Sequence, residues 1–329
     1  MTAISGRKRV KLGSREVGDG APVCVVYEAG PTHDGLESAK ALASLAARAG
    51  GAMETVEEPL YDILMRRVLT KPQWHTLKAH CDREQLAFFA TATFDDEIDL
   101  LAELGCHSIK IASGDVNHLP LIRRAARTGM CLQLDTGNSD LGEIAAAVDV
   151  IRSEGNESIV IHQCPSGYPA HLDSINLRII ETLRQMFPYP VAFSDHTPGV
   201  TMDIAAVAMG ANLVEKTITL DRMTRSIEHV MSLEPEEMAQ FVQMIADVER
   251  AMGTPHRILH DVERKRRLAI RRSVFLDGPV KATQRLHDVK VLFRRPGYGL
   301  PPDQYEALVD ARFRRDLPAG HMVIAADLE

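Results

Sequence analysis

Short runs of β-favouring residues alternate with longer amphipathic stretches along most of this chain, and the pair of patterns occurs eight times. Regular alternation predicts a parallel sheet, because every crossover between parallel strands needs a helix. Eight repeats favour an α/β fold of the closed (β/α)8 barrel type over an open doubly wound sheet. The expected strands are residues 24–29, 52–56, 87–91, 108–111, 131–134, 158–162, 191–193 and 212–215. The clearest expected helices are residues 36–49, 96–104, 119–127, 141–153, 177–186, 200–209 and 234–252.

The chain is longer than a barrel needs, and its pattern changes near Ser273. It has 329 residues, whereas one barrel takes about 250. Beyond Ser273 the segments are short and rich in turn residues, as in Asp277-Gly278-Pro279. We therefore expect a barrel over residues 1–260, a linker over 261–272 and a small β-rich domain over 273–329.

Charge and cysteine usage exclude several classes of protein. A formal net charge of −7 argues against a nucleic-acid partner, because such binders carry a basic excess. Five cysteines without a C-x-x-C pair indicate reduced thiols rather than disulfides or a zinc knuckle. Neither a signal-peptide pattern nor an apolar run of membrane-spanning length is present in the sequence. We expect a cytoplasmic protein that acts on small molecules.

Polar residues stand at the end of every expected strand. The active site of such a barrel lies at the carboxyl ends of its strands, so these residues are site candidates. Lys110 and Lys216 each close an otherwise apolar strand, which favours a lysine that holds an anion or acts as an amine nucleophile. His196 follows Asp195 at another strand end, where it could bind a metal or transfer a proton.

Several ordered segments together resemble one enzyme family. They are Glu28-Ala29-Gly30-x-x-His33-x-Gly35, Lys110-Ile111-Ala112-Ser113-Gly114-Asp115, Thr136-Gly137, Tyr168-Pro169 with Asn176-Leu177, Ser194-Asp195-His196-Thr197-x-Gly199, Glu215-Lys216-x-x-Thr219-Leu220-Asp221-Arg222, and His229-x-x-Ser232-Leu233. This set resembles the N-acetylneuraminate synthase family, which makes sialic, legionaminic and pseudaminic acids. Near the end, Arg272-Ser273 and Arg295-Pro296-Gly297-x-Gly299 resemble the antifreeze-like domain of these enzymes.

The resemblance implies a reaction, an assembly and a set of site residues. Such enzymes condense phosphoenolpyruvate with the aldehyde of an open-chain amino sugar, aided by Mn²⁺ or Mg²⁺. They are homodimers in which the antifreeze-like domain caps the partner's barrel. The predicted catalytic residues are Glu28, Lys110, Asp195, His196 and Lys216, with His196 also a metal ligand. The predicted substrate-binding residues are Thr93, Ser113, Asp115, Asp135, Tyr168, Ser194, Glu228 and, from the partner subunit, Arg295.

Four positions depart from the family pattern that the resemblance implies. Thr55-Val56-Glu57 stands where the family has Lys-Phe-Gln, and Asp135 stands where it has serine. Thr217 replaces the second metal-binding histidine, and Glu228 replaces an aspartate. A cation is lost and carboxylates are gained near the expected phosphate position. Opposed like charges there weaken the binding of a multiply charged donor.

Three functions remain open from the sequence. The chain is a synthase with a rearranged site, or it acts on a less anionic substrate without phosphoenolpyruvate in the manner of an aldolase or lyase. It could also be a non-catalytic sugar-binding relative. The ionisable groups at the strand ends favour an enzyme over a binding protein.

Overall fold

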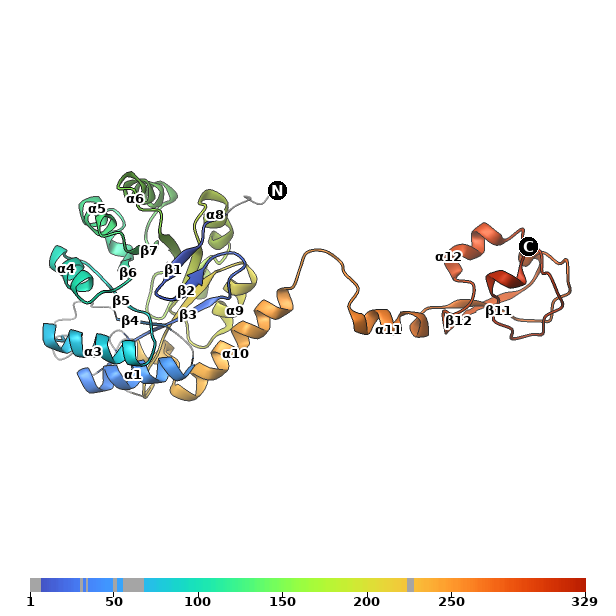
Figure 1. Ribbon diagram of the computed structural model, residues 1–329, viewed down its shortest axis with the longest axis horizontal. Coiled ribbons are helices and arrows are strands. Elements are labelled where there is room, and N and C mark those ends of the chain that lie inside the picture. The colour runs from blue at the N-terminus through green and yellow to red at the C-terminus, as the bar shows by residue number, and fades with distance from the viewer. Residues whose placement is uncertain (1–6, 30–31, 34, 50–51, 56–67, 224–227) are drawn as a thin grey trace. The chain divides into compact units, whose positions relative to one another are not determined.

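Eight parallel strands form a closed barrel in the structure, a computed structural model (Figure 1). The structure describes residues 7–29, 32–33, 35–49, 52–55, 68–223 and 228–329. The barrel strands are β3 (Cys24–Glu28), β4 (Ala52–Thr55), β5 (Phe88–Thr91), β6 (Ser108–Ile111), β7 (Cys131–Asp135), β8 (Ile159–Gln163), β9 (Val191–Asp195) and β10 (Leu213–Thr217). Sequence neighbours pair in order, and β10 closes the ring against β3. The predicted barrel is confirmed.

Helices surround the barrel and follow the strands in turn (Figure 1). They are α1 (Leu36–Ala49), α3 (Lys71–Arg83), α4 (Asp95–Glu103), α5 (Leu119–Arg127), α6 (Leu141–Ser153), α7 (Leu172–Ile175), α8 (Ile179–Met186), α9 (Thr201–Ala208) and α10 (Pro235–Met252). The amphipathic pattern predicted α1, α5 and α6 with the observed bounds. α3 begins with Pro72 in its first turn, where a missing N–H costs nothing.

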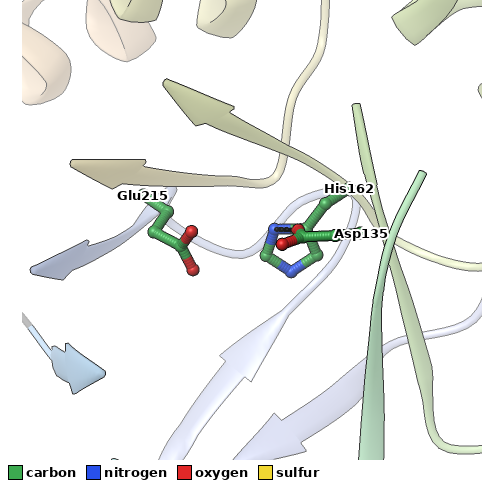
Figure 2. A group of neighbouring side chains, drawn as sticks. All are labelled: Asp135, His162 and Glu215. Carbon is green, nitrogen blue, oxygen red and sulfur yellow. Dashed lines mark ion pairs between the residues drawn. The ribbon is translucent and has the colours of Figure 1, made fainter. Parts of the chain in front are cut away.

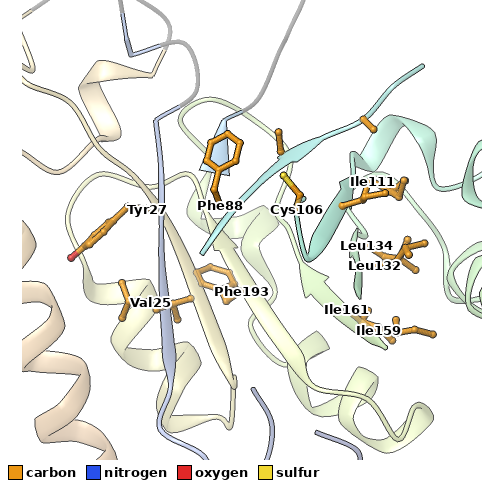
Figure 3. Packing of buried hydrophobic residues seen from close by; sticks show 14 of the residues in the cluster. Val25, Tyr27, Phe88, Cys106, Ile111, Leu132, Leu134, Ile159, Ile161 and Phe193 are labelled. Carbon is orange, nitrogen blue, oxygen red and sulfur yellow. The ribbon is translucent and has the colours of Figure 1, made fainter. Parts of the chain in front are cut away.

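Along the strands whose side chains the structure describes, alternate residues face the helices and the barrel interior, as a pleated strand requires. Val25, Tyr27 and Val214 belong to the outer core between strands and helices, while Val26 and Leu213 belong to an inner cluster. Figure 3 shows part of the outer core, with Leu132 and Leu134 of β7 beside Ile159 and Ile161 of β8. A residue's parity along its strand therefore decides whether it can reach the barrel interior.

A hairpin that the sequence did not predict closes the amino-terminal end of the barrel. It consists of β1 (Val10–Leu12) and β2 (Arg15–Val17), which pair antiparallel. Val10, Leu12 and Val17 are buried in the inner cluster with Cys24 and Leu213, which begin their strands. The barrel interior is thus apolar at this end and polar toward the strand carboxyl ends.

The chain divides into two compact units, Met1–Gly253 and Thr254–Glu329. The second unit begins with α11 (Asp261–Ile270), followed by the antiparallel pair β11 (Ser273–Leu276) and β12 (Val291–Arg294), then α12 (Pro302–Tyr305). Short 3-10 turns lie between and after them, and a separate core includes Val274, Leu286 and Phe313. The identification of this unit as an antifreeze-like domain stays a prediction.

Among the described residues, no helix has both the length and the apolar character that crossing a membrane requires.

Candidate active site

A pocket of about 200 Å³ lies at the carboxyl ends of the barrel strands. It brings together predicted residues from six strands and the loops after them. Those that line it are Glu28, Thr93, Lys110, Ser113, Asp135, Tyr168 and His196. Thr91, Asn138 and Ser166 also line it and offer further hydroxyl and amide groups. The convergence of these groups makes this pocket the candidate active site.

Lys110 is the cation at the base of this pocket, and two carboxylates hold it. Its ammonium lies 3.1 Å from Asp135 Oδ2 and also donates to Glu215 Oε1. Ser194 Oγ donates to the same Glu215 oxygen at 2.5 Å, which fixes the glutamate in place. All four side chains are buried. The charge of Lys110 is therefore largely compensated inside the protein.

Buried carboxyl groups in and beside the pocket resist ionisation. Burial raises the pKa of Asp135 to about 7, although Lys110 acts in the opposite direction. Burial and the neighbouring Glu228 raise the pKa of Glu28 well above its ordinary value. A raised pKa makes Glu28 hold its proton more readily than an ordinary glutamate, and a protonated carboxyl group can donate a hydrogen bond or the proton itself. Glu28 is thus equipped to act as a general acid.

His196 presents one nitrogen lone pair to the pocket. Its Nδ1 lies 3.2 Å from the Pro165 carbonyl oxygen, which only accepts, so Nδ1 carries the hydrogen. Burial and Lys110 lower the pKa of His196 to about 4, so the ring is neutral near pH 7. Its ring packs against that of Tyr168 with a centroid distance of 4.4 Å. Nε2 can therefore accept a hydrogen bond from a substrate.

The residues at His196 do not fit the Mn²⁺ or Mg²⁺ ion that the family resemblance implies there. The second imidazole of that site is replaced by Thr217, whose hydroxyl is fully buried and makes no hydrogen bond with the described residues. A neutral hydroxyl is a weak ligand compared with imidazole or carboxylate for these ions. One imidazole alone does not make such a site.

Lys216 and Asp195 lie outside the barrel interior, so the geometry gives no support to the direct catalytic roles predicted for them. The two residues are strand partners with outward parity. Lys216 Nζ donates to Asp195 Oδ2 and to the Thr197 carbonyl oxygen, each at 2.5 Å. It also lies 3.7 Å from Asp203 of α9, and all three side chains are fully buried. They join the strands to a helix behind the pocket.

The other predicted residues fall in different places. Ser194 is buried and donates to Glu215, which binds the pocket residue Lys110, while Glu228 is buried and raises the pKa of Glu28. Asp115 is partly exposed and is not among the residues that line the pocket. Arg295 is exposed in the second unit, so its predicted role stays a prediction. Glu57 lies outside the described residues, as does the side chain of Thr55.

A cluster that the sequence did not predict as a site lies beneath the pocket. Asp135, His162 and Glu215 each place one ligand atom within 4.8 Å of the others, from β7, β8 and β10 (Figure 2). Asp135 and His162 are direct partners in the β7–β8 register. In the sequence, Asp135 and His162 stand at the ends of two consecutive predicted strands, and this is the signal that could have identified the cluster. Its donor set is consistent with a divalent metal.

The family profile described as NeuB family matches residues 38–257. The N,N'-diacetyllegionaminic acid synthase of Legionella pneumophila is 29% identical, over 98% of this chain and 99% of that protein. The crystal structure of an N-acetylneuraminic acid synthetase from Leptospira borgpetersenii in complex with citrate has a TM-score of 0.74 and 28% identity. It covers 79% of this chain and 95% of its own. Spore coat polysaccharide biosynthesis protein SpsE from Bacillus subtilis has a TM-score of 0.69 and 28% identity, over 98% of this chain and 99% of that one.

Proposed function

Because this chain belongs to the NeuB family, we propose that it condenses phosphoenolpyruvate with the aldehyde of an open-chain amino sugar. The product is a nonulosonic-type 2-keto-3-deoxy acid. The observation that carries the proposal is the pocket that collects Lys110, Ser113, Glu28 and His196 at the strand carboxyl ends. The synthase names of related proteins support the same class of reaction.

The described residues suit each part of such a condensation. The Lys110 ammonium and the hydroxyls of Thr93 and Ser113 bind the anionic donor by charge-assisted hydrogen bonds. The enol pair of the donor forms the new bond from its C3 to the aldehyde carbon. Glu28 gives its proton to the aldehyde oxygen as that oxygen gains negative charge.

The second half of the reaction releases phosphate. Water adds at C2 of the donor and gives one proton to the Glu28 carboxylate. Phosphate then leaves with the electron pair of the C2–O bond and takes the second proton, so that a ketone forms at C2. Neutral His196 accepts a hydrogen bond through Nε2 and orients the water or a sugar hydroxyl. Tyr168, which is 42% exposed, lies at the pocket mouth and contacts the sugar chain.

One observation favours a second candidate function. Asp135 and Glu215 compensate the charge of Lys110, so the pocket is poorly suited to a donor with several negative charges. A less anionic donor such as pyruvate would meet weaker repulsion. The chain would then join pyruvate to an aldehyde, or split the adduct, in the manner of an aldolase.

Phosphate release separates these two candidates. Purified protein is incubated with N-acetylmannosamine or a 2,4-diacetamido hexose, with either phosphoenolpyruvate or pyruvate, and with or without Mn²⁺. The proposal expects phosphate release that depends on both substrates and that Lys110→Met abolishes. If the sugar reacts with pyruvate but not with phosphoenolpyruvate, the condensation with phosphoenolpyruvate is excluded. Normal turnover of the sugar with phosphoenolpyruvate would exclude the aldolase function.

Asp135→Ser tests the electrostatic argument within the same assay. Removing this carboxylate relieves one repulsion of the donor phosphate at close range. We expect the KM for phosphoenolpyruvate to fall about tenfold, since a charge pair near 5 Å is worth more than 1 kcal/mol at a dielectric of about 20. The KM for the sugar serves as the internal control and should change little.

The second unit has a proposed role in a homodimer. The sequence of Arg295-Pro296-Gly297 resembles the arginine segment of an antifreeze-like domain. We propose that Arg295 of one subunit reaches the sugar in the barrel of the other. Its exposed position in the second unit leaves it accessible for this contact.

A further inference from the structure

His162 Nδ1 and Asp135 Oδ1 are two buried atoms that face each other beside the pocket, and with Asp135 ionised both are hydrogen-bond acceptors. Gln133 Nε2 donates to Ser108 Oγ at 2.8 Å, which turns its amide oxygen toward His162 Nε2 at 3.0 Å. That oxygen only accepts, so Nε2 carries the ring hydrogen and Nδ1 carries a lone pair. His162 Nδ1 lies 3.6 Å from Asp135 Oδ1.

Neither His162 Nδ1 nor Asp135 Oδ1 has a hydrogen-bond partner among the residues that the structure describes. His162 is fully buried, and burial lowers its pKa to about 3, which keeps the ring neutral. A separation of 3.6 Å is too long for a proton to join the two atoms directly. When Asp135 is ionised, two buried lone pairs face each other, and this costs free energy unless a positive group lies between them.

The separation suits two ligands of one metal ion. Bonds of about 2.1 Å place neighbouring ligand atoms about 3.0–3.4 Å apart, so 3.6 Å needs only a small adjustment. Glu215 adds a second carboxylate within 4.8 Å of both (Figure 2). Gln133 orients the imidazole as outer groups commonly orient metal-binding histidines.

The Lys110 ammonium holds only part of this position. It bonds Asp135 Oδ2 and Glu215 Oε1, and thereby leaves Asp135 Oδ1 and His162 Nδ1 facing each other. A divalent ion between the three side chains would reach all of them and would repel the ammonium from the carboxylates. The Lys110 ammonium and a divalent metal ion therefore compete for the same carboxylates.

We propose that Asp135, His162 and Glu215 form a site for a divalent first-row metal ion such as Mn²⁺, which displaces Lys110 from its two carboxylates. The site is separate from the His196 position and does not depend on which donor the enzyme uses. With Lys110 counted, the metal changes the charge of these four side chains from net negative to net positive. Lys110, which lines the pocket, then becomes available to an anionic ligand.

Metal binding to the full-length protein tests the site without an activity assay. The protein is freed of metal with a chelator, and Mn²⁺ is titrated while the EPR signal of the free ion is recorded. We expect His162→Gln and Asp135→Ser to weaken Mn²⁺ binding at least ~10-fold, because each removes a ligand. His196→Gln is the matched control and should bind as the wild type does.

The Lys110→Met substitution should change the Mn²⁺ affinity in the opposite direction. Without the competing ammonium, we expect Mn²⁺ to bind ~10-fold more tightly and to raise the Tm more than in the wild type. A weaker or unchanged affinity in this variant would contradict the competition. Circular dichroism of each variant confirms that it is folded before titration.

Cu²⁺ shows in the wild-type protein whether an imidazole nitrogen binds the metal, and the two histidine variants then show which imidazole it is. The EPR spectrum of bound Cu²⁺ should show coupling to one imidazole nitrogen. Coupling that His162→Gln removes and His196→Gln keeps supports the site. The reverse pattern, no nitrogen coupling, or no Mn²⁺ binding at millimolar concentration would each overturn it.

Discussion

At the scale of single residues, strand parity separates the two lysines that the sequence made look alike. Lys110 shares its parity with Ser108 and enters the barrel, whereas Lys216 shares its parity with Val214 and faces the helices. Lys110 follows Ile109, and Lys216 comes two residues after Leu213-Val214, so both stand near the end of a partly apolar strand, which is why both were predicted as catalytic. Counting from the observed strand starts, Ser108 and Leu213, distinguishes them, whereas counting from the predicted start at residue 212 gives both lysines the same parity.

Lys216→Met tests the structural role of the outward-facing lysine. The substitution leaves Asp195 and Asp203 buried without their cation, which should lower the free energy of unfolding by about 3–5 kcal/mol. Urea unfolding at neutral pH measures this loss. A variant that keeps its stability but loses turnover would restore the catalytic role. The double variant Lys216→Met with Asp203→Asn is the control and should recover part of the lost stability.

His196 gives the barrel a defined sensitivity to acid. Its pKa is about 4 in the folded protein and about 6.5 when unfolded. A lowered pKa means that its contribution to stability is complete above pH 6.5 and is lost as the pH falls through 4. We expect the wild type to lose roughly 3 kcal/mol more than His196→Gln between these pH values. Denaturant unfolding at each pH compares the two, and equal losses would contradict the burial argument.

At the scale of elements, the sequence predicted the barrel strands to within two residues, because alternating apolar runs fix where a parallel strand lies. It missed β1 and β2, whose three-residue length gives too little periodicity to recognise. The sequence predicted only part of the candidate site, because it shows which residues stand at strand ends but not which strands meet across the barrel. Glu28, Lys110 and His196 stand at strand ends. His162 is the register partner of Asp135 on the adjacent strand, but Glu215 joins them only when β10 meets β7 and β8 across the barrel.

Close approach of loops fixes the position of Ser113. A Cβ on Gly137 would lie 2.7 Å from the Cys164 carbonyl oxygen and 2.8 Å from Ser113 Oγ. We expect Gly137→Ala to cost about 1–3 kcal/mol of unfolding free energy and to raise the KM for the donor, since Ser113 must shift. Gly114→Ala, in the same part of the pocket but with open space around its Cβ, is the control for thermal unfolding and kinetics. Equal effects of the two would contradict the steric explanation.

At the scale of the whole molecule, the proposed dimer predicts that damaged subunits complement each other. Lys110→Met and Arg295→Ala damage the same site from different subunits if Arg295 acts across the interface. A mixed dimer then holds one site with both lesions and one with neither. Randomly mixed dimers should recover about a quarter of wild-type turnover, because half of them are mixed and each holds one intact site.

Mixing the two proteins under conditions that exchange subunits, then measuring phosphate release, checks this prediction. Lys110→Met mixed with Ser113→Ala is the control, since both residues lie in one barrel and cannot complement. Failure of Arg295→Ala to complement Lys110→Met, after subunit exchange has been verified, would place Arg295 in its own subunit or outside the site.

The hairpin β1–β2 at the amino-terminal end of the barrel also bears on kinetics. With that end closed by Val10, Leu12 and Val17, ligands share the entrance at the strand carboxyl ends. Lys110 lies at the buried base of the pocket, while Tyr168 lies at its exposed mouth. Under the proposed function, a donor held by Lys110 enters before an acceptor that contacts Tyr168, so we expect ordered binding. The sugar analogue should then inhibit uncompetitively with respect to the donor.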